Sequence, residues 1–503
     1  MSHMASSGWG LWKIKLKLKE LRMNHLFKYI LPALCVSLTV YGCGSGSSST
    51  VEMQSSNTNV LNGVTLMGSQ QGKSAGLADV DGDNITDKVV CAPYATTSTN
   101  TGAILVYKGD STGGFSSSPS SLLTGDDVFG ASFVKLAQSS NDTAERFAVA
   151  ALYGDGDDVS LSGSVSIYEG ESSGPKLIKK LAGEGPLDRF GFSLEAGDLD
   201  GDGYNDLIVG AQYNTPSSLL YQQGAVYVYF GPDFTRSIAL RATSANKGLG
   251  WAVAAGDING DGKADLLISA SGKVLVYNGG ASFGDGSATP VSVDSPNLTV
   301  KSTASGFGKA MAVIGDVNGD GVSEIAIGAP NAVVGANRDT GTVYIVKGTA
   351  TGTVDLGAAT PPADLIVKIN GAALFDRFGS SIVPVGDVDG DGKADFAVSA
   401  PLADVNTNDT SGKVYLFKGK DIDTLTTLAN ATAFKGSMID QSYGTFIASA
   451  GPGRLMIGAP TANMNTGSVF MVDLATGEVV TGGSSGGSTG GGLDCTSMPG
   501  MCM

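Results

Sequence analysis

Histidine is nearly absent from this 503-residue chain, and charged residues are scarce. The two histidines, His3 and His25, stand within the first 25 residues, in a segment that we expect to be removed. Without histidine, a Ser-His-Asp or Cys-His catalytic group and a histidine-ligated zinc site are excluded. Charged residues make up 16% of the chain, against about 25% in an average soluble domain. Long helices with charged surfaces are therefore not expected.

Proline is also scarce, with 17 residues, whereas glycine is abundant, with 73. Because aliphatic residues remain plentiful, the composition is neither collagen-like nor that of a disordered chain. The length is typical of two to four domains or of one large repeat architecture.

The N-terminal apolar run is too short to span a membrane. Met23, a candidate true start, opens a basic stretch, which a short apolar run and small residues follow up to Cys43. This pattern is typical of a secretory signal, so we expect residues 1–42 to be removed. The ending Val-Tyr-Gly-Cys resembles the lipobox of bacterial lipoproteins, which implies a lipid on Cys43 and an anchor in the outer membrane, facing the periplasm or the cell surface. An ordinary signal peptide cut nearby is the alternative.

The remainder of the chain is strongly acidic. Residues 1–42 hold six Lys/Arg and one Glu, which leaves 26 basic and 47 acidic residues and a net charge of −21. A chain of this charge without a basic run should be repelled by nucleic acid. Nucleic acid is therefore excluded as a partner.

A repeat of about sixty residues dominates the sequence, and such repeats indicate stacked or radial architectures. Seven short apolar runs each end in a small residue plus alanine, and the spacings between these alanines are 59, 60, 59, 59, 71 and 59 residues. The alanines are Ala92, Ala151, Ala211, Ala270, Ala329, Ala400 and Ala459.

Each repeat also has a sequence pattern typical of β-strands. An aromatic-glycine pair such as Phe190-Gly191 precedes most of the alanines by about twenty residues, and a second run of β-branched and aromatic residues such as VYVYFG follows. Such runs predict strands. Sixty residues allow about four strands, so we predict an all-β, seven-bladed β-propeller over residues 59–480, with a solenoid as the alternative.

Three finer expectations follow from the propeller. The alanines should lie in the innermost strands, where blades crowd the axis, together with Cys91 as a small buried residue. The N-terminal strand, residues 60–67, should pair with residues 468–474 and complete the last blade. Residues 43–58 then form a flexible tether.

Five repeats carry an acidic segment of nine residues, which we call the acidic turns, with positions 1 to 9. They are residues 79–87, 198–206, 257–265, 316–324 and 387–395. Oxygen-bearing side chains stand at positions 1, 3, 5 and 9, with glycine at 4 and usually at 6. Alternating oxygen ligands and a carbonyl at position 7 suit Ca²⁺ better than Mg²⁺, which prefers water and strict octahedra. About five calcium ions are therefore expected.

The predicted ligands follow this pattern in every acidic turn, with position 7 contributing its backbone carbonyl. They are Asp79, Asp81, Asp83, Ile85, Asp87; Asp198, Asp200, Asp202, Tyr204, Asp206; Asp257, Asn259, Asp261, Lys263, Asp265; Asp316, Asn318, Asp320, Val322, Glu324; and Asp387, Asp389, Asp391, Lys393, Asp395.

These motifs resemble the FG-GAP repeats of the integrin α-subunit propeller and its bacterial relatives. The resemblance rests on the aromatic-glycine pairs, the acidic turns, and the Gly-Ala-Pro triplets at 328–330 and 458–460. It implies seven blades with Ca²⁺ in turns on one face and ligands usually bound on the opposite face.

The second and seventh repeats depart from the pattern. Arg146 and Arg454 stand at position 9, where the other repeats have Asp or Glu. A guanidinium there opposes cation binding and either supplies the missing positive charge or is simply solvated. We expect no metal in these two repeats.

Trp251 and the C-terminal segment remain. Trp251 is interpreted as a core residue, with a sugar-stacking platform as the alternative. Residues 481–503 combine a Gly/Ser-rich linker with a Cys/Met tail, in which we expect a Cys495–Cys502 disulfide or, alternatively, a soft-metal site.

We expect this chain to act in adhesion or in binding a protein or glycan ligand, without catalysis. A rigid propeller face with variable loops suits such binding. Two other functions stay open. One is a Ca²⁺-dependent carbohydrate-active enzyme, a lyase or hydrolase, and the other is a structural subunit of a surface assembly.

Overall fold

The computed structural model divides the chain into two units, Met1–Ser56 and Asn57–Met503. It describes residues 60–478 of the second unit, with gaps at 62–63, 66–69, 72, 97–100, 126, 137–144, 156–158, 215–222, 243–246, 281–282, 284–291, 406–409, 426, 437–440 and 463–465. The predicted signal segment, the Cys43 lipid, the tether, and the tail with Cys495 and Cys502 lie outside the described residues.

Nearly all regular structure in the described part is β-strand, which confirms the all-β prediction. Two short 3-10 helices, η1 (Gly419–Thr424) and η2 (Leu428–Asn430), are the helical elements described. None of the helices in the described residues has the length and apolar character needed to cross a membrane.

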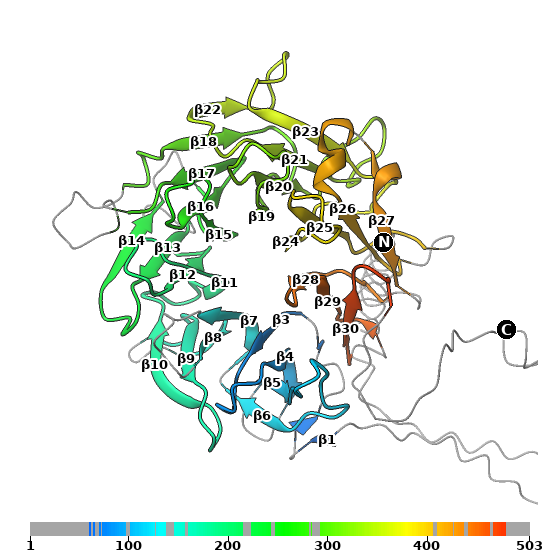
Figure 1. Cartoon of the computed structure of the whole chain (residues 1–503). Helices are drawn as coiled ribbons and strands as arrows, with labels where there is room; N and C mark the ends of the chain where they lie inside the picture. The colour runs from blue at the N-terminus through cyan, green and yellow to red at the C-terminus, as the bar shows by residue number, and fades with distance from the viewer. Residues whose placement is uncertain are drawn as a thin grey trace, which may run out of the picture. The chain divides into compact units, whose positions relative to one another are not determined.

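The strands form antiparallel sets that follow one another in chain order (Figure 1). Two sets share one ten-stranded sheet: β3 (Ala75–Ala78), β4 (Asp87–Thr96), β5 (Thr101–Tyr107) and β6 (Ser121–Thr124); and β7 (Phe129–Leu136), β8 (Arg146–Ala151), β9 (Ser164–Glu169) and β10 (Lys176–Ala182). The two sets are joined by a single parallel pair, Gly102 with Phe129.

Five separate sheets come next. Their strands are β11 (Phe190–Gly197), β12 (Asp206–Ala211), β13 (Ala225–Tyr229), β14 (Ser237–Arg241); β15 (Val253–Gly256), β16 (Asp265–Ala270), β17 (Lys273–Tyr277), β18 (Leu298–Lys301); β19 (Ala310–Val313), β20 (Ile325–Ala329), β21 (Thr342–Val346), β23 (Leu365–Asn370); β24 (Ile382–Gly386), β25 (Asp395–Ala400), β26 (Lys413–Phe417), β27 (Thr432–Lys435); and β28 (Phe446–Ser449), β29 (Arg454–Ala459), β30 (Ser468–Asp473). One further strand, β22 (Gly352–Asp355), lies between β21 and β23 in the chain but belongs to the preceding sheet, where it pairs in parallel with β18.

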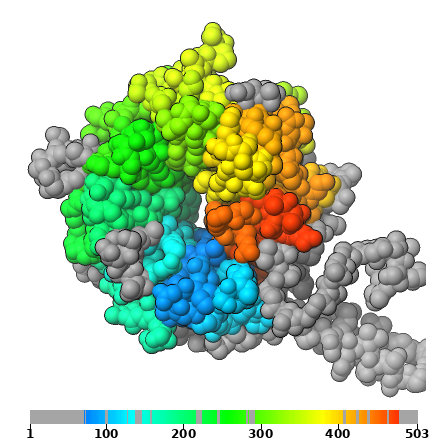
Figure 2. Space-filling view, in the orientation of Figure 1, coloured from blue at the N-terminus to red at the C-terminus, as the bar shows by residue number. Residues whose placement is uncertain are grey.

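Within this unit the sets are arranged radially, as in a β-propeller. Figure 1 shows the first strand of every set nearest the centre, and Figure 2 shows the described residues of successive sets side by side around a central hollow. Apolar side chains fill the space between neighbouring sheets; Ile208 and Val226 of one sheet, for example, pack in one cluster with Ile268 and Leu275 of the next. Burial between sheets thus supplies the main apolar stabilisation.

Neighbouring sets touch through one recurring contact between a glycine and the aromatic position of the repeat. Parallel bridges join Gly224 with Leu249 and Gly341 with Phe378, in the same manner as the pair between β5 and β7. The glycines at these contacts leave no room for a side chain, since a Cβ on Gly341 would lie 2.1 Å from the Phe378 oxygen. The aromatic-glycine motif is therefore an inter-sheet contact.

The residue before the aromatic position has a positive φ in every repeat: Gln70, Val128, Arg189, Gly248, Gly306, Arg377 and Ser442. Only two of these residues are glycines, although glycine adopts this conformation at the lowest cost. The packing of neighbouring sheets, rather than the residue type at this position, therefore determines the positive φ.

The same contact joins the last sheet to the first. Gly467 bridges Gln71 in parallel, and the Gln71 N–H donates to the Thr466 carbonyl over 2.9 Å. The prediction that residues 60–67 pair with 468–474 is wrong. β1 (Val60–Leu61) pairs with β2 (Val64–Thr65), which continues to β4, and within the described residues β30 pairs with β29. The ring is closed by a contact between inner edges, which needs no shared strand.

The repeat alanines lie in the second strand of each set, and not in the innermost strand as predicted. Ala211 and Ala329, for example, end β12 and β20, whose neighbours on both sides are strands of the same sheet. Their exposed fraction is 0%. A small residue suits this position because the second strand is covered on both faces. Cys91 of β4 is buried as predicted, and burial raises the pKa of its thiol to about 12.

Candidate functional site

All five acidic turns connect the first strand of a set to its second strand. They follow β3, β11, β15, β19 and β24. Because the first strands run in the same direction in a radial arrangement of like sheets, the turns lie on one face of the sheets. The five predicted sites are thus equivalent in position.

Position 1 of each turn organises the backbone. One Asp198 carboxylate oxygen accepts the N–H groups of Gly201 and Asp202 over 2.7 and 3.1 Å, and the other accepts that of Gly203 over 2.9 Å. The other four turns repeat this pattern. Gly201 and Gly203 have φ values of 81° and 91°, which explains the two glycines. Asn84, with φ of 63°, replaces the second glycine, as asparagine tolerates this region.

Position 9 is a buried anchor. Asp206 has an exposed fraction of 0%, and its two oxygens accept the N–H groups of Leu199 and Gly231 over 2.9 and 3.0 Å. Equivalent bonds hold Asp87, Asp265 and Asp395. The second donor in each case is a glycine after the third strand, so this carboxylate links the turn to the sheet.

Burial raises the pKa of these anchors. Desolvation raises the pKa of Asp206 and of Glu324 to about 7, and it also raises that of Asp87, Asp265 and Asp395. Neighbouring carboxylates of the same turn add to the effect. A bound cation would act in the opposite direction, since positive charge favours the ionised carboxylate.

Three turns bring carboxylates together at metal-binding distance. In each, one oxygen from positions 1, 3 and 9 lies within 4.8 Å of the other two: Asp79, Asp81 and Asp87; Asp198, Asp200 and Asp206; and Asp387, Asp389 and Asp395. One oxygen of Asp81 and one of Asp389 are buried and accept no hydrogen bond from the described residues. A buried oxygen of this kind is costly without a partner, and a hard cation is the partner that carboxylate oxygens suit.

Basic side chains contact the outer oxygen of position 3 in the same three turns. Lys108 lies 2.6 Å from Asp81 and 3.0 Å from Asp83, Arg236 pairs with Asp200, and Lys418 and Lys420 lie 2.9 and 2.6 Å from Asp389. Lys420 and Lys418 hold the pKa of Asp389 at about 2. Sequence analysis missed these residues, although Lys108 and Lys418 stand in matching YKG and FKG segments.

The other two turns have asparagine at position 3 and three carboxylates. The Asn259 amide donates to Asp265 over 3.2 Å, and that of Asn318 donates to Glu324 over 2.8 Å. Among the described residues, no basic side chain forms an ion pair with these turns at the distances seen for Lys108. In these two turns the neutral asparagine amide therefore occupies position 3, where the other three turns have their fourth carboxylate.

The position-7 residues and the position-5 carboxylates lie at the exposed edge of the turns. The N–H of each position-7 residue (Ile85, Tyr204, Lys263, Val322 and Lys393) donates to the carboxylate at position 5. These bonds orient position 5 within its own turn.

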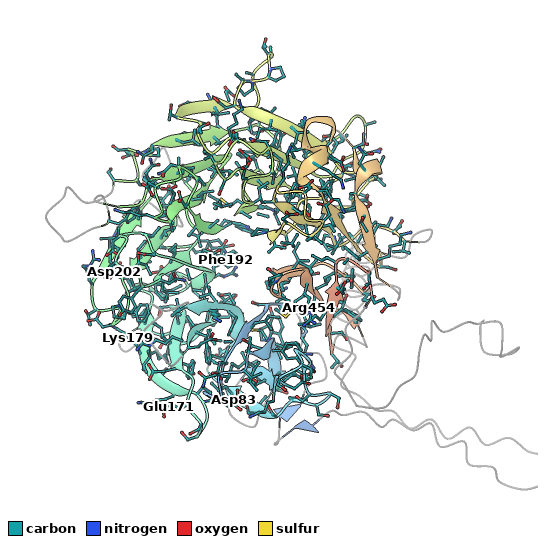
Figure 3. The ribbon with its side chains drawn as sticks, viewed as in Figure 1. Asp83, Glu171, Lys179, Phe192, Asp202 and Arg454 are labelled. Carbon is teal, nitrogen blue, oxygen red and sulfur yellow. The ribbon has the colours of Figure 1, made fainter. Side chains whose placement is uncertain are left out.

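The two arginine repeats differ in their contacts. The Arg146 Nε donates to Glu169 over 2.9 Å, and its Nη1 donates to the Pro232 carbonyl of the next set over 2.9 Å. The Arg454 Nη1 donates to the Gly113 carbonyl over 2.9 Å. Each guanidinium therefore points to a turn of the following set. Figure 3 shows Arg454 beside the first set and Asp83 and Asp202 on their own acidic turns.

The FG-GAP repeat family matches four segments, residues 190–229, 249–293, 307–346 and 378–417. These segments contain four of the five acidic turns. The chain is 32% identical to chicken integrin alpha-V over 205 residues, which cover 38% of this chain and 17% of the relative. It is 28% identical to Drosophila melanogaster integrin alpha-PS3 over 241 residues, 46% of this chain and 19% of the relative.

An enzyme is also among the relatives. Bovine phosphatidylinositol-glycan-specific phospholipase D is 26% identical over 336 residues, 48% of this chain and 39% of the relative. The match spans about a fifth of the length of the two integrins named above. This chain therefore contains FG-GAP repeats, and in its repeats and its β-propeller fold it is similar to the integrin alpha subunits.

Proposed function

We propose that this protein is an exported, calcium-binding β-propeller of seven blades that binds a protein or glycan ligand in adhesion. The observation that carries the proposal is the convergence of three carboxylates in each of three turns; at Asp81 and at Asp389 one buried oxygen accepts no hydrogen bond from the part of the chain that the structure describes. A bound cation would offset the repulsion between the carboxylates of one turn and would supply the partner that the buried oxygens need.

Seven blades follow if the ten-stranded sheet is counted as two. Its two antiparallel sets meet at one residue pair, whereas strands within a blade pair along their length. Seven repeat alanines in the sequence and the positive φ before the aromatic position of each repeat support this count. Seven is within the usual range for propellers.

Calcium is favoured over magnesium by the donor set. The turns offer carboxylates, an amide oxygen and backbone carbonyls in an irregular arrangement, and Ca²⁺ accepts six to eight such ligands with flexible geometry. Mg²⁺ requires near-ideal octahedra and keeps several waters. We therefore expect about five calcium ions, with the predicted ligands of the five acidic turns.

The ligand face is the one opposite the acidic turns. Loops that join second to third strands and one set to the next lie there. They and the end of β4 carry most of the exposed large hydrophobic residues described: Leu161, Leu187, Trp251, Val333, Leu374 and Phe375 in the loops, and Tyr94 in β4. Exposed apolar residues gathered on one face are typical of an interaction surface.

The location completes the proposal. A lipid on Cys43 would anchor the protein in the outer membrane, with the Cys495–Cys502 pair oxidised in the same compartment. The acidic charge disfavours nucleic acid as a partner.

Ion counting tests the proposal. The protein is dialysed against millimolar calcium and analysed for bound metal, and a second sample is treated with chelator. We expect five calcium ions that magnesium does not replace. The ligand is sought with a glycan and protein array probed with and without calcium. Absence of bound calcium would overturn the metal assignment, and turnover of an arrayed glycan would favour an enzyme.

A further inference from the structure

A pocket of about 520 Å³ opens at the end of β15 and β16 that lies opposite the acidic turn 257–265. It lies on the proposed ligand face, between the sheet of β15 and the start of β19. Its lining includes Trp251, residues 269–272 and residues 302–309. This volume is typical of sites that hold a small molecule or one to two sugar rings.

Trp251 forms an accessible aromatic wall of this pocket. Its exposed fraction is 39%, so the interpretation of Trp251 as a core residue is wrong. Phe192 packs edge-on against the indole, with ring centroids 5.2 Å apart, and Figure 3 shows Phe192 at the inner side of the ring of sheets. An indole held by a neighbouring ring offers a rigid apolar surface with little entropy to lose on binding.

The rest of the lining is hydroxyl-rich. Five of its side chains are serine or threonine. The Oγ of Ser269 accepts the Ala252 N–H over 2.8 Å, and that of Ser302 accepts the Ala304 N–H over 3.2 Å. A hydroxyl that accepts a bond from the backbone still has its own proton to donate.

Lys309 is the one charged side chain among the lining residues. Its Nζ lies 5.1 Å from the Trp251 ring centroid and 3.0 Å from the Asn331 Oδ1. The Asn331 amide in turn donates to Asp339 over 2.8 Å. The ammonium is thereby held at the edge of the aromatic wall. No carboxylate is among the lining residues, so the charge of Lys309 favours neutral or negative ligands over cations.

We propose that this pocket binds an acidic saccharide, whose ring stacks on Trp251 and whose carboxylate pairs with Lys309. The C–H face of a sugar ring matches the apolar indole, its hydroxyls match the serines and the threonine, and its carboxylate gains a charge-assisted hydrogen bond. This inference names the ligand class of the proposed binding function. It rests on the ligand face of that proposal and not on the calcium sites.

The test is calorimetric titration of the full chain, in millimolar calcium, with a galacturonate trisaccharide. The uncharged galactose trisaccharide and an acidic peptide are titrated separately as comparison ligands. We expect galacturonate to bind at least ~10-fold more tightly than galactose, with an affinity that falls as salt is raised, and we expect no binding of the peptide.

Two variants assign the binding to the pocket. Trp251→Ala should abolish binding of both sugars, while Trp251→Phe should retain part of it. Lys309→Met should weaken galacturonate binding ~10-fold and leave galactose unchanged. Tyr94→Ala removes another exposed aromatic on the same face outside the pocket and serves as the control; it should bind as the wild type does.

Each other outcome overturns the inference. Equal affinity for galactose would remove the acidic preference, peptide binding would assign the pocket to protein, and absence of binding to all three probes would leave no saccharide site. The ion count on the same samples reports on the calcium proposal separately, because a calcium-loaded protein that ignores all three probes refutes the pocket alone.

Discussion

The five acidic turns and the two arginine turns occupy equivalent places in the sheets, yet their charges are reversed. In the arginine sets, Arg146 and Arg454 face Glu169 and Asp473 across neighbouring strands. In two acidic sets, a lysine, Lys108 or Lys418, follows the third strand at the matching place. These four turns are thus matched by an opposite charge from their own sheet.

The arginine turns and the acidic turns differ in how far the partner charges balance the charge of the turn. Arg146 forms a direct ion pair with Glu169 at 2.9 Å, so its charge is balanced within its own sheet. The turn 79–87 has four carboxylates and one basic partner, Lys108, which leaves an excess of negative charge. Charge excess, rather than the presence of carboxylates alone, therefore distinguishes the turns that need an external cation.

Removal of calcium should give the largest effect. A site that binds only the folded state adds about 2.7 kcal/mol when free calcium is 100 times its dissociation constant, and the five acidic turns would add together. We expect chelation to lower the melting temperature strongly in scanning calorimetry, and calcium to restore it better than equal magnesium. An unchanged melting curve in chelator would contradict the comparison as a whole.

Substitution of a single anchor should have the next largest effect. Asp206→Ala removes one ion and also leaves the Leu199 and Gly231 N–H groups without their acceptor, for a loss of about 2–3 kcal/mol in the free energy of unfolding. Asp206→Asn keeps one acceptor oxygen and should lose the ion at a smaller cost in stability.

Elemental analysis and urea unfolding of both variants check this prediction. Retention of all five ions by Asp206→Ala would mean that position 9 is a structural anchor without a role in metal binding.

Substitution of an arginine should destabilise the fold without changing the ion count. Arg146→Ala removes the ion pair with Glu169 and the bond to the Pro232 carbonyl, for an expected cost of ~1–2 kcal/mol. Bound calcium should stay at the wild-type number. Loss of an ion in this variant would show that the second repeat carries a site after all.

The lysines that contact position 3 should lower the calcium affinity of their acidic turn. In Lys418→Met/Lys420→Met, Asp389 loses both ammonium groups, so the chelated protein should be less stable while calcium binds a few-fold (~3-fold) more tightly. Lys347→Met changes a lysine at the corresponding place beside a turn with asparagine at position 3, and it serves as the matched control. Calcium titration of the melting temperature distinguishes the two variants.

The acidic turns could be predicted because their interactions are local. Asp198 bonds to backbone groups three to five residues later, so the spacing of aspartates and glycines carries the geometry. The FG-GAP resemblance was confirmed for the same reason, since the matched segments consist of these local motifs.

The features that sequence missed depend on contacts between distant residues. Lys108 contacts Asp81 from 27 positions away, and its YKG segment does not by itself identify that partner. A positive φ at Val128 and Arg189 is imposed by the neighbouring sheet. The exposure of Trp251 could not be read from its sequence context either, because Leu249 replaces the aromatic residue of the repeat. The position of the alanines was mistaken because small residues suit both a crowded axis and a strand covered on both faces.

The bridge between Gly467 and Gln71 has a mechanical consequence. Successive sets are connected by the chain itself, whereas the described residues of the first and last sets meet through non-covalent contacts: the backbone bridge, the bond of Arg454 to the Gly113 carbonyl, and the packing of Met456 with Ala75. Tension applied to the two ends of the ring would therefore load this junction before it loads any sheet. We expect the ring to open there with its sheets intact and to reclose when the force is removed.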